Sequence, residues 1–393
     1  MVDTTRMTKL LLCSPLVSFL LSGSEGVSLS NGSIKNSSIP PAFAGGFGRA
    51  RDGATSKKGK IKKRKGKLTE ISNPPNTLHD DGRKVDDDSS ASLQKLDKWG
   101  LPVATIDDIF PPMPPETEIT PIESNKEYDL DEILECLKDH IDLHLDRTFD
   151  ENGVEKISKV MTPTNESRQP MELQLLHKSP PVLAIHNFFT VDECVRMKKI
   201  ALDDNSGAYQ VNSATFSGAL STRTSTSWFC LYKSCSELLA KAHYLLNIPL
   251  EAMEEPQVVR YKTGQEFSWH YDEVPAPQLK NGGQRLATLL VYLSDLPNGG
   301  GGTVFRDLRH PNGDPLSMQP KLGSALLFFP AFKNGRPDDR TLHKGEVISG
   351  EDEKWIIQMW IHETAYKAVL PEGNNQELAR DSIESVRIEL GLA

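Results

Sequence analysis

The sequence predicts a mostly β fold with flanking helices, built on a double-stranded β-helix (jelly-roll) core and preceded by a disordered N-terminal region. Two observations lead to this prediction. Residues 220–365 consist of short apolar β segments separated by Gly and Pro clusters, which is typical of antiparallel barrels and jelly rolls. Residues 23–127 are poor in aromatic residues and rich in Pro, Ser, Gly and charge. They therefore bury too little apolar surface to offset the entropy of the chain.

The first 24 residues resemble a processing segment. Arg6 and Lys9 precede an apolar run, Leu10–Leu21, which is short for a bilayer span but has the length of a signal-peptide core. We expect residues 1–24 to direct the chain to the endoplasmic reticulum and secretory pathway, with membrane attachment only if the run is retained. A plastid is the alternative, because Pro41–Ala44 precedes a basic stretch, as in the bipartite plastid signals of some algae.

Residues 25–127 are predicted to be a disordered linker with a basic tract. Arg51–Lys67 contain nine Lys and Arg residues and one acid, Asp52, and such blocks are usually solvated. The whole chain carries a net charge of −9, so we expect no nucleic-acid partner. Composition indicates no particular oligomeric state.

Residues 128–179 are expected to hold a helix and a connecting segment. Apolar residues recur at helical spacing over Asp129–Asp146, and Asp129 can cap the helix start. His140 and His144 are four residues apart and could share a metal ion. They flank the apolar stripe, however, and we expect them at the surface.

The folded domain is predicted to occupy residues 180–365, followed by a C-terminal helix within residues 366–393. A buried strand, Val182–Phe189, leads to a capping box, Thr190–Glu193, that begins a helix. A second helix is expected near Ser236–Leu246 and the last over Gln376–Leu390. The predicted strands after residue 220 are Ser225–Leu231, Gln257–Tyr261, Phe267–Tyr271, Arg285–Leu293, Thr303–Phe305, Ala325–Phe329, Leu342–Ile348 and Trp355–Ile361.

One tripeptide, His270-Tyr271-Asp272, has the residue types of a metal site. Residues i and i+2 of a strand point to the same side, so the imidazole and the carboxylate can meet at one point. His343 opens a later strand and can supply a second imidazole. Two His and one carboxylate that leave positions open are the ligand set of non-haem Fe(II) oxygenases.

Around this tripeptide the chain resembles the catalytic domain of prolyl 4-hydroxylases, which depend on 2-oxoglutarate and act on collagen and on plant and algal wall proteins. The resemblance covers residues 180–365, about half of the chain. It is carried by ordered blocks, namely Asn187–Phe189, Arg223–Ser225, Val258–Tyr261, Gly264–Gln265, His270–Asp272, Gly282–Thr288, Val291–Asp295, Gly301–Phe305, Pro320–Phe329, Leu342–His343, Glu353–Trp355 and Trp360–Ile361.

The resemblance implies roles for matching positions on the cofactor side. His270, Asp272 and His343 would bind Fe(II) and form the catalytic centre. Lys354 would pair with the distal carboxylate of 2-oxoglutarate, and the resemblance implies that Tyr261 and Thr303 hydrogen-bond the same carboxylate. Arg340 and Lys344 are rivals for the role of Lys354, but neither lies in the lysine block. L-Ascorbate is implied as the reductant that restores the iron.

On the substrate side the resemblance implies a procollagen-proline 4-dioxygenase-like enzyme that takes a Pro-rich peptide or protein. Arg285, Trp360 and Phe267 match positions near the peptide. Phe267 stands where the family often has Tyr, and the loop from Tyr271 to Gln284 is shorter than in many relatives.

Two other functions stay open. The same chemistry could act on a small molecule or on another side chain, which the departures at the substrate side favour. A non-catalytic jelly-roll protein that binds a metal or ligand is the third option. Such a protein would have no need for both the triad and Lys354.

Overall fold

The computed structural model describes residues 105–144, 169–212, 223–368, 370 and 376–392, together with short stretches between 148 and 160. All of these residues belong to one compact unit, Ala44–Ala393. The signal-like segment and the basic tract lie outside the described residues. Within the described part, the structure contains no helix long and apolar enough to cross a membrane.

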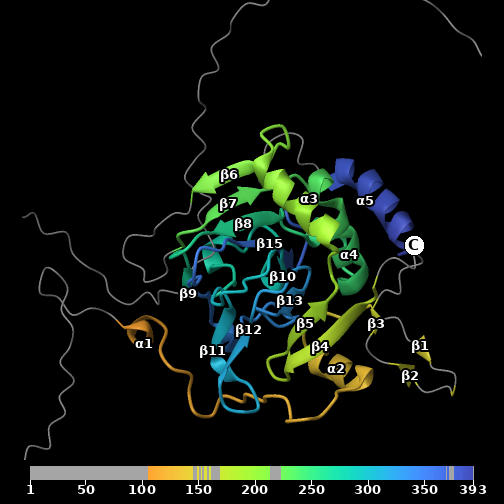
Figure 1. The fold of residues 1–393 in the computed structure, drawn as a ribbon. Helices are drawn as coiled ribbons and strands as arrows, with labels where there is room; N and C mark the ends of the chain where they lie inside the picture. Colours follow the sequence, from red (N-terminus) through yellow and green to blue (C-terminus); the bar gives the residue numbers. More distant parts are fainter. Residues whose placement is uncertain are drawn as a thin grey trace, which may run out of the picture. The chain divides into compact units, whose positions relative to one another are not determined.

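Nine strands form a large antiparallel sheet (Figure 1). In spatial order they are β3 (Lys159–Val160), β4 (Met171–His177), β5 (Val182–His186), β13 (Ala325–Phe328), β10 (Arg285–Tyr292), β15 (Lys354–His362), β8 (Gln257–Tyr261), β7 (Thr226–Phe229) and β6 (Tyr209–Asn212). Strands β10 and β15 are buried along their whole length. Both faces of the sheet are therefore covered, which explains why these strands read as continuous apolar runs.

A smaller antiparallel sheet completes the core. Its spatial order is β12 (Pro315–Met318), β11 (Thr303–Arg309), β14 (His343–Gly345) and β9 (Phe267–His270). From β8 to β15 the chain passes back and forth between the two sheets. Alternation of this kind closes two antiparallel sheets into a jelly roll, so the predicted double-stranded β-helix is confirmed. A separate hairpin joins β1 (Thr148–Phe149) to β2 (Glu155–Lys156).

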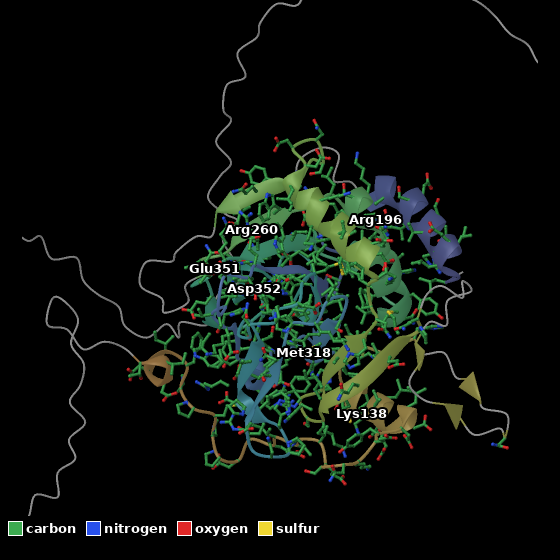
Figure 2. All side chains as sticks on the ribbon, viewed as in Figure 1. Lys138, Arg196, Arg260, Met318, Glu351 and Asp352 are labelled. Carbon is green, nitrogen blue, oxygen red and sulfur yellow. The ribbon has the colours of Figure 1, made fainter. Side chains whose placement is uncertain are left out.

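The large sheet separates two hydrophobic cores. Leu290 and Val259 belong to the inner core between the sheets, whereas their neighbours Leu289 and Val258 belong to the outer core beneath the helices. This division follows from the alternation of side chains along a strand. Figure 2 shows the side chains that fill this interior, including Met318 of β12.

Helices α3 (Val191–Leu202), α4 (Ser236–Leu246) and α5 (Gln376–Leu390) lie on the outer side of the large sheet (Figure 1). The Thr190–Glu193 capping box is confirmed, with both of its hydrogen bonds present. Helix α5 has the predicted bounds. Short 3-10 turns occur at Tyr232–Cys235, Leu250–Ala252, Ala276–Gln278 and Asp339–Thr341; the last of these is η4.

The helix predicted over Asp129–Asp146 is shorter than expected. Helix α2 spans Leu130–Leu137 and ends at Lys138. His140 is buried, not at the surface, because its ring packs between those of Phe329 and Phe332. This tertiary contact and the backbone hydrogen bond from Lys333 to Asp139 draw the chain away from helical geometry. His144 is exposed, as expected.

Residues 105–120 form an extended segment, which we call the strap. It contains one short helix, α1 (Ile106–Ile109). The prediction of a structureless linker up to residue 127 is wrong from Thr105 onward, because Phe110 is buried and Thr120 forms a β-bridge with Ser179. Pro-rich composition suggested a loop but gave no sign of these distant partners.

Candidate metal centre

Three side chains converge at the edge of the small sheet. His270 ends β9 and His343 begins β14, and the two residues are direct partners across these strands. Asp272 follows two residues after His270. Its carboxylate oxygens lie 3.7 Å from His270 Nε2 and 3.8 Å from His343 Nε2. All three residues are buried, and their ligand atoms lie within 4.8 Å of one another.

Backbone carbonyls orient both imidazoles. His270 Nδ1 lies 2.7 Å from the Ser268 carbonyl oxygen, and His343 Nδ1 lies 2.9 Å from that of Thr341. A carbonyl only accepts, so each Nδ1 carries the proton and donates it. Each Nε2 is then the atom with a free lone pair, directed at the shared point. This is the usual arrangement of metal-binding histidines.

The protonation states also suit a metal ion. Burial, followed by the repulsion from His343, lowers the pKa of His270 to about 3, so its imidazole is neutral at physiological pH. Burial would raise the pKa of Asp272, but the attraction of His343, His270 and Arg285 outweighs it and the pKa is lowered. The Thr288 hydroxyl donates to Asp272 at 2.8 Å. A donor set of two imidazoles and one carboxylate fits Fe(II).

A buried lysine lies in the inner core near this centre. Lys354 begins β15, is 2% exposed and pairs across the sheet with Tyr261. Its ammonium donates to the Gly301 carbonyl and lies 5.3 Å and 5.6 Å from the ring centres of Tyr261 and Tyr292. The Tyr292 hydroxyl is 2.9 Å from that of Thr303. The predicted residues Lys354, Tyr261 and Thr303 thus gather in one place.

Lys354 forms no ion pair among the described residues, although Glu346 attracts its ammonium electrostatically. Among the described residues, no carboxylate lies within ion-pair distance of its ammonium, and burial lowers its pKa to about 7. A buried ammonium is costly unless an anion accompanies it. The surroundings therefore fit the carboxylate of a bound anion.

The two rival cations lie elsewhere. Arg340 forms a bidentate ion pair with Asp338. Lys344 lies 5.1 Å from the Trp269 ring centre and 3.9 Å from Glu346. Neither cation contacts Tyr261, Tyr292 or Gly301, the residues that surround the Lys354 ammonium.

Comparison with known proteins agrees with this geometry. The profile of the 2OG-Fe(II) oxygenase superfamily matches residues 256–362. Probable prolyl 4-hydroxylase 10 of Arabidopsis thaliana is 31% identical over 222 residues, which are 52% of this chain and 76% of the relative.

The chain belongs to the prolyl 4-hydroxylase family.

Other members of the family give similar figures. Prolyl 4-hydroxylase 2 of Arabidopsis thaliana is 30% identical over 237 residues, or 55% of this chain and 78% of the relative. Among solved structures, the viral collagen prolyl hydroxylase of Paramecium Bursaria Chlorella virus-1 is 26% identical, with 46% of this chain and 94% of that chain covered and a TM-score of 0.34. This family consists of 2-oxoglutarate-dependent dioxygenases, so Fe(II) and 2-oxoglutarate are the metal and cosubstrate that the site implies.

Phe267 lies directly on the metal centre of this prolyl 4-hydroxylase fold. Its ring stacks on that of His270 at 3.5 Å between centres, and the Arg223 guanidinium carbon lies 5.0 Å from the centre of the Phe267 ring. The residue is buried. Its position beside the metal ligands is compatible with the predicted place near the substrate.

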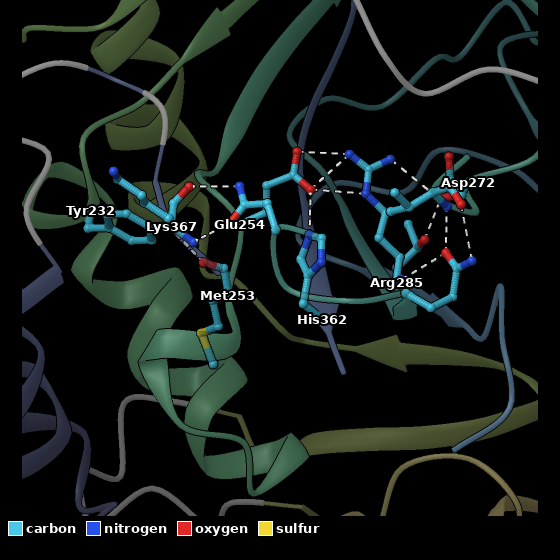
Figure 3. A network of polar contacts seen from close by, with 11 residues as sticks. Tyr232, Met253, Glu254, Asp272, Arg285, His362 and Lys367 are labelled. Atoms are coloured by element: carbon cyan, nitrogen blue, oxygen red, sulfur yellow. Dashed lines mark hydrogen bonds and ion pairs between the residues drawn. The ribbon is translucent and has the colours of Figure 1, made fainter. Parts of the chain in front are cut away.

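Arg285 belongs to a buried polar network (Figure 3), and the Trp360 ring packs against its guanidinium. Arg285 is 5% exposed and donates twice to Glu254, at 2.9 and 2.8 Å, and once to the Asp272 carbonyl at 3.3 Å. Its guanidinium carbon lies 3.9 Å from the Trp360 ring centre. His362 Nε2 also contacts Glu254, at 2.9 Å. The guanidinium therefore supports the loop that carries Asp272, while a contact of Arg285 or Trp360 with a peptide stays a prediction.

Sequence reasoning did not single out Glu254, His362 or Thr288. Glu254 precedes β8, and its charge partners come from β10 and β15, so its neighbours along the chain carry no signal of the network. A buried histidine at the end of the apolar strand Lys354–His362 is the one feature that could have indicated a buried polar partner. Burial would raise the pKa of Glu254, but Arg285 and His362 reverse this and lower it.

Proposed function

We propose that this chain hydroxylates peptidyl proline at C4, using Fe(II) and 2-oxoglutarate and releasing succinate and CO2. One observation carries the proposal: the His270, Asp272 and His343 donor set lies in the same core as a buried lysine that forms no ion pair among the described residues. The names of the relatives support proline as the residue that is modified.

Each group would have a distinct task. His270, Asp272 and His343 would hold Fe(II), which supplies dioxygen activation coupled to the oxidative decarboxylation of 2-oxoglutarate. The Lys354 ammonium would bind the distal carboxylate of the cosubstrate, with Tyr261 and Thr303 beside it. These side chains are all buried, and the exclusion of water around them strengthens each electrostatic contact. L-Ascorbate is proposed as the reductant that restores the iron after turnover without substrate.

The substrate is proposed to be an extended, Pro-rich peptide. Such peptides are pre-organised as polyproline II, so that binding costs little entropy. The loop Tyr271–Gln284 and the segment Lys333–Arg340 are the candidate walls of its groove, and they are linked by a hydrogen bond from the Tyr271 hydroxyl to the Asp339 carbonyl. Phe267 lacks the hydroxyl of the usual Tyr and would position the peptide less tightly.

We also propose that the protein works in the endoplasmic reticulum or secretory pathway, with a plastid as the alternative. The support is the apolar run Leu10–Leu21 behind Arg6 and Lys9. Fluorescence imaging of the full chain, tagged at its C-terminus, would distinguish these compartments.

Mass spectrometry tests the reaction. A panel of Pro-rich peptides and free proline would be incubated with the protein, Fe(II), 2-oxoglutarate and ascorbate, with succinate measured in parallel and His343→Ala as control. We expect a peptide to gain the mass of one oxygen atom, with succinate released. If free proline is hydroxylated and no peptide is, the substrate is a small molecule, which is the alternative that Phe267 favours. If no succinate is released, the enzymatic proposal is refuted, and a protein that binds a metal or ligand without catalysis remains.

A further inference from the structure

The strap, residues 105–120, lies outside the segment matched by the family profile. It nevertheless contacts residues that adjoin the metal ligands in the chain or across the sheet. Phe110 is 4% exposed, although the prolines that follow it are exposed. Its ring meets that of Tyr271 edge to face, with 5.5 Å between centres and 78° between planes. Tyr271 stands between the ligands His270 and Asp272 in the chain.

A second contact comes from β11. The Arg306 guanidinium donates to the carbonyls of Phe110 and Pro111. Arg306 follows Phe305, which is the direct strand partner of His343. Its own amide donates to the Leu342 carbonyl at 3.0 Å. One end of the strap is thereby connected to the strand that carries the third ligand.

The other end of the strap is held by Arg340, three residues before His343. Its guanidinium donates to the Glu118 carbonyl at 3.1 Å and to the Ser179 hydroxyl at 2.9 Å. Two further backbone hydrogen bonds, each 2.9 Å long, join Thr120 to Ser179. Arg340 belongs to η4, whose last residue, Thr341, accepts the hydrogen bond that orients His343.

The ligand-bearing strands need outside support. Strand β9 is the edge of the small sheet, Asp272 lies beyond its end, and β14 has three residues. Short edge elements with few neighbours open easily. Two of the strap contacts involve residues within three positions of a metal ligand, Tyr271 and Arg340. The third involves Arg306, which adjoins the strand partner of His343.

We propose that the strap is a positioning element of the metal centre: Phe110, held by Arg306, keeps the segments that carry His270, Asp272 and His343 in the geometry that binds the metal. Phe110 is a positioning residue, because it acts through Tyr271 and touches no ligand itself. The inference rests on the metal assignment made above, not on the identity of the substrate.

Cobalt(II) binding to the full chain tests this role without turnover. Cobalt resists oxidation during the measurement, and its visible absorption reports ligand geometry. We expect Phe110→Ala to weaken Co(II) binding about tenfold, the scale of losses when groups behind the ligands are removed, and to alter the absorption bands. Arg306→Gln should act in the same direction. The control is Ile133→Ala in α2, another buried apolar truncation, which should lower stability and leave Co(II) binding unchanged.

Hydrogen exchange of the wild-type chain gives a measurement that no folding defect can disturb. If the strap favours metal binding, metal binding must favour the docked strap to the same degree. Amides of residues 106–120 should therefore exchange more slowly with Co(II) bound. Equal Co(II) affinity in Phe110→Ala and wild type, or unchanged exchange in the strap, would overturn the inference. Failure of the wild type to bind Co(II) would overturn the metal assignment as well, and with it the proposed function.

Discussion

At the scale of single residues, Lys354 couples cosubstrate binding to pH. Burial lowers its pKa to about 7, so above that pH much of the ligand-free protein carries a neutral amine. A bound carboxylate favours the ammonium, and binding must then take up a proton. We expect the affinity of the Mn(II)-loaded protein for 2-oxoglutarate to fall by up to about tenfold per pH unit above the pKa.

Calorimetry in buffers of different ionisation enthalpy would detect this proton. Lys354→Arg is the matched control, because a guanidinium stays protonated throughout the range. Equal proton uptake by the two proteins would refute the coupling.

Glu254 provides a second test at this scale. It is the counter-charge of the buried Arg285, so Glu254→Gln leaves a buried cation unpaired. Removal of one partner of a buried pair costs about 3–5 kcal/mol, which denaturant unfolding would measure. Glu237→Gln breaks the more exposed pair with Arg196 (Figure 2) and should cost less than about 1 kcal/mol. If the two variants lose similar amounts of unfolding free energy, the buried network stabilises the fold no more than an exposed ion pair does.

The chemistry-bearing residues differed in how far the sequence could predict them. His270 and Asp272 are two positions apart, so strand alternation alone indicates that they point the same way, and the structure does bring them together. Arg285 was predicted to lie near the substrate, and this stays a prediction; its donors in the structure are directed to Glu254 and to the Asp272 backbone. That preference depends on a carboxylate from a distant part of the chain, which no local pattern specifies.

At the scale of elements, the turn that leads into β13 packs closely on the start of α3. Gly323 has φ of +78°, and a Cβ there would lie 2.2 Å from the Phe189 carbonyl oxygen. Gly299 has φ of +80° but open space around it. Gly299→Ala should cost about 1–2 kcal/mol for the left-handed backbone, and Gly323→Ala about 1–3 kcal/mol more for the clash. Thermal unfolding of both variants would show whether the close approach matters.

Elements were predictable where their own residues determine them. Strand β8 has the predicted bounds, Gln257–Tyr261, because its apolar run is flanked by clear breaks. Strand β12 was missed, since it begins at Pro315 and has few apolar residues. The strap was missed for a related reason: its order comes from arginines of β11 and η4, while its own Pro-rich composition indicates a loop.

At the scale of the whole molecule, the large sheet lies between the outer hydrophobic core and the inner core beside the metal ligands. Ile383 of α5 is buried in the outer core, on the other side of the sheet from the metal ligands. Ile383→Ala should cost about 2–5 kcal/mol of unfolding free energy without changing Co(II) affinity. Ile388→Ala, on the same helix but 62% exposed, should be nearly neutral. A loss of Co(II) affinity in Ile383→Ala would show that the two cores are coupled.

The alternation of strands between the two sheets also constrains the order of events during synthesis. β9 has its strand partner in β14, and β8 has one in β15, so the pairs that surround the metal join the two ends of the barrel segment. Such long-range pairings form late. A ribosome must therefore release almost the entire domain before His343 can meet His270, and a site with all three ligands cannot exist before that pairing.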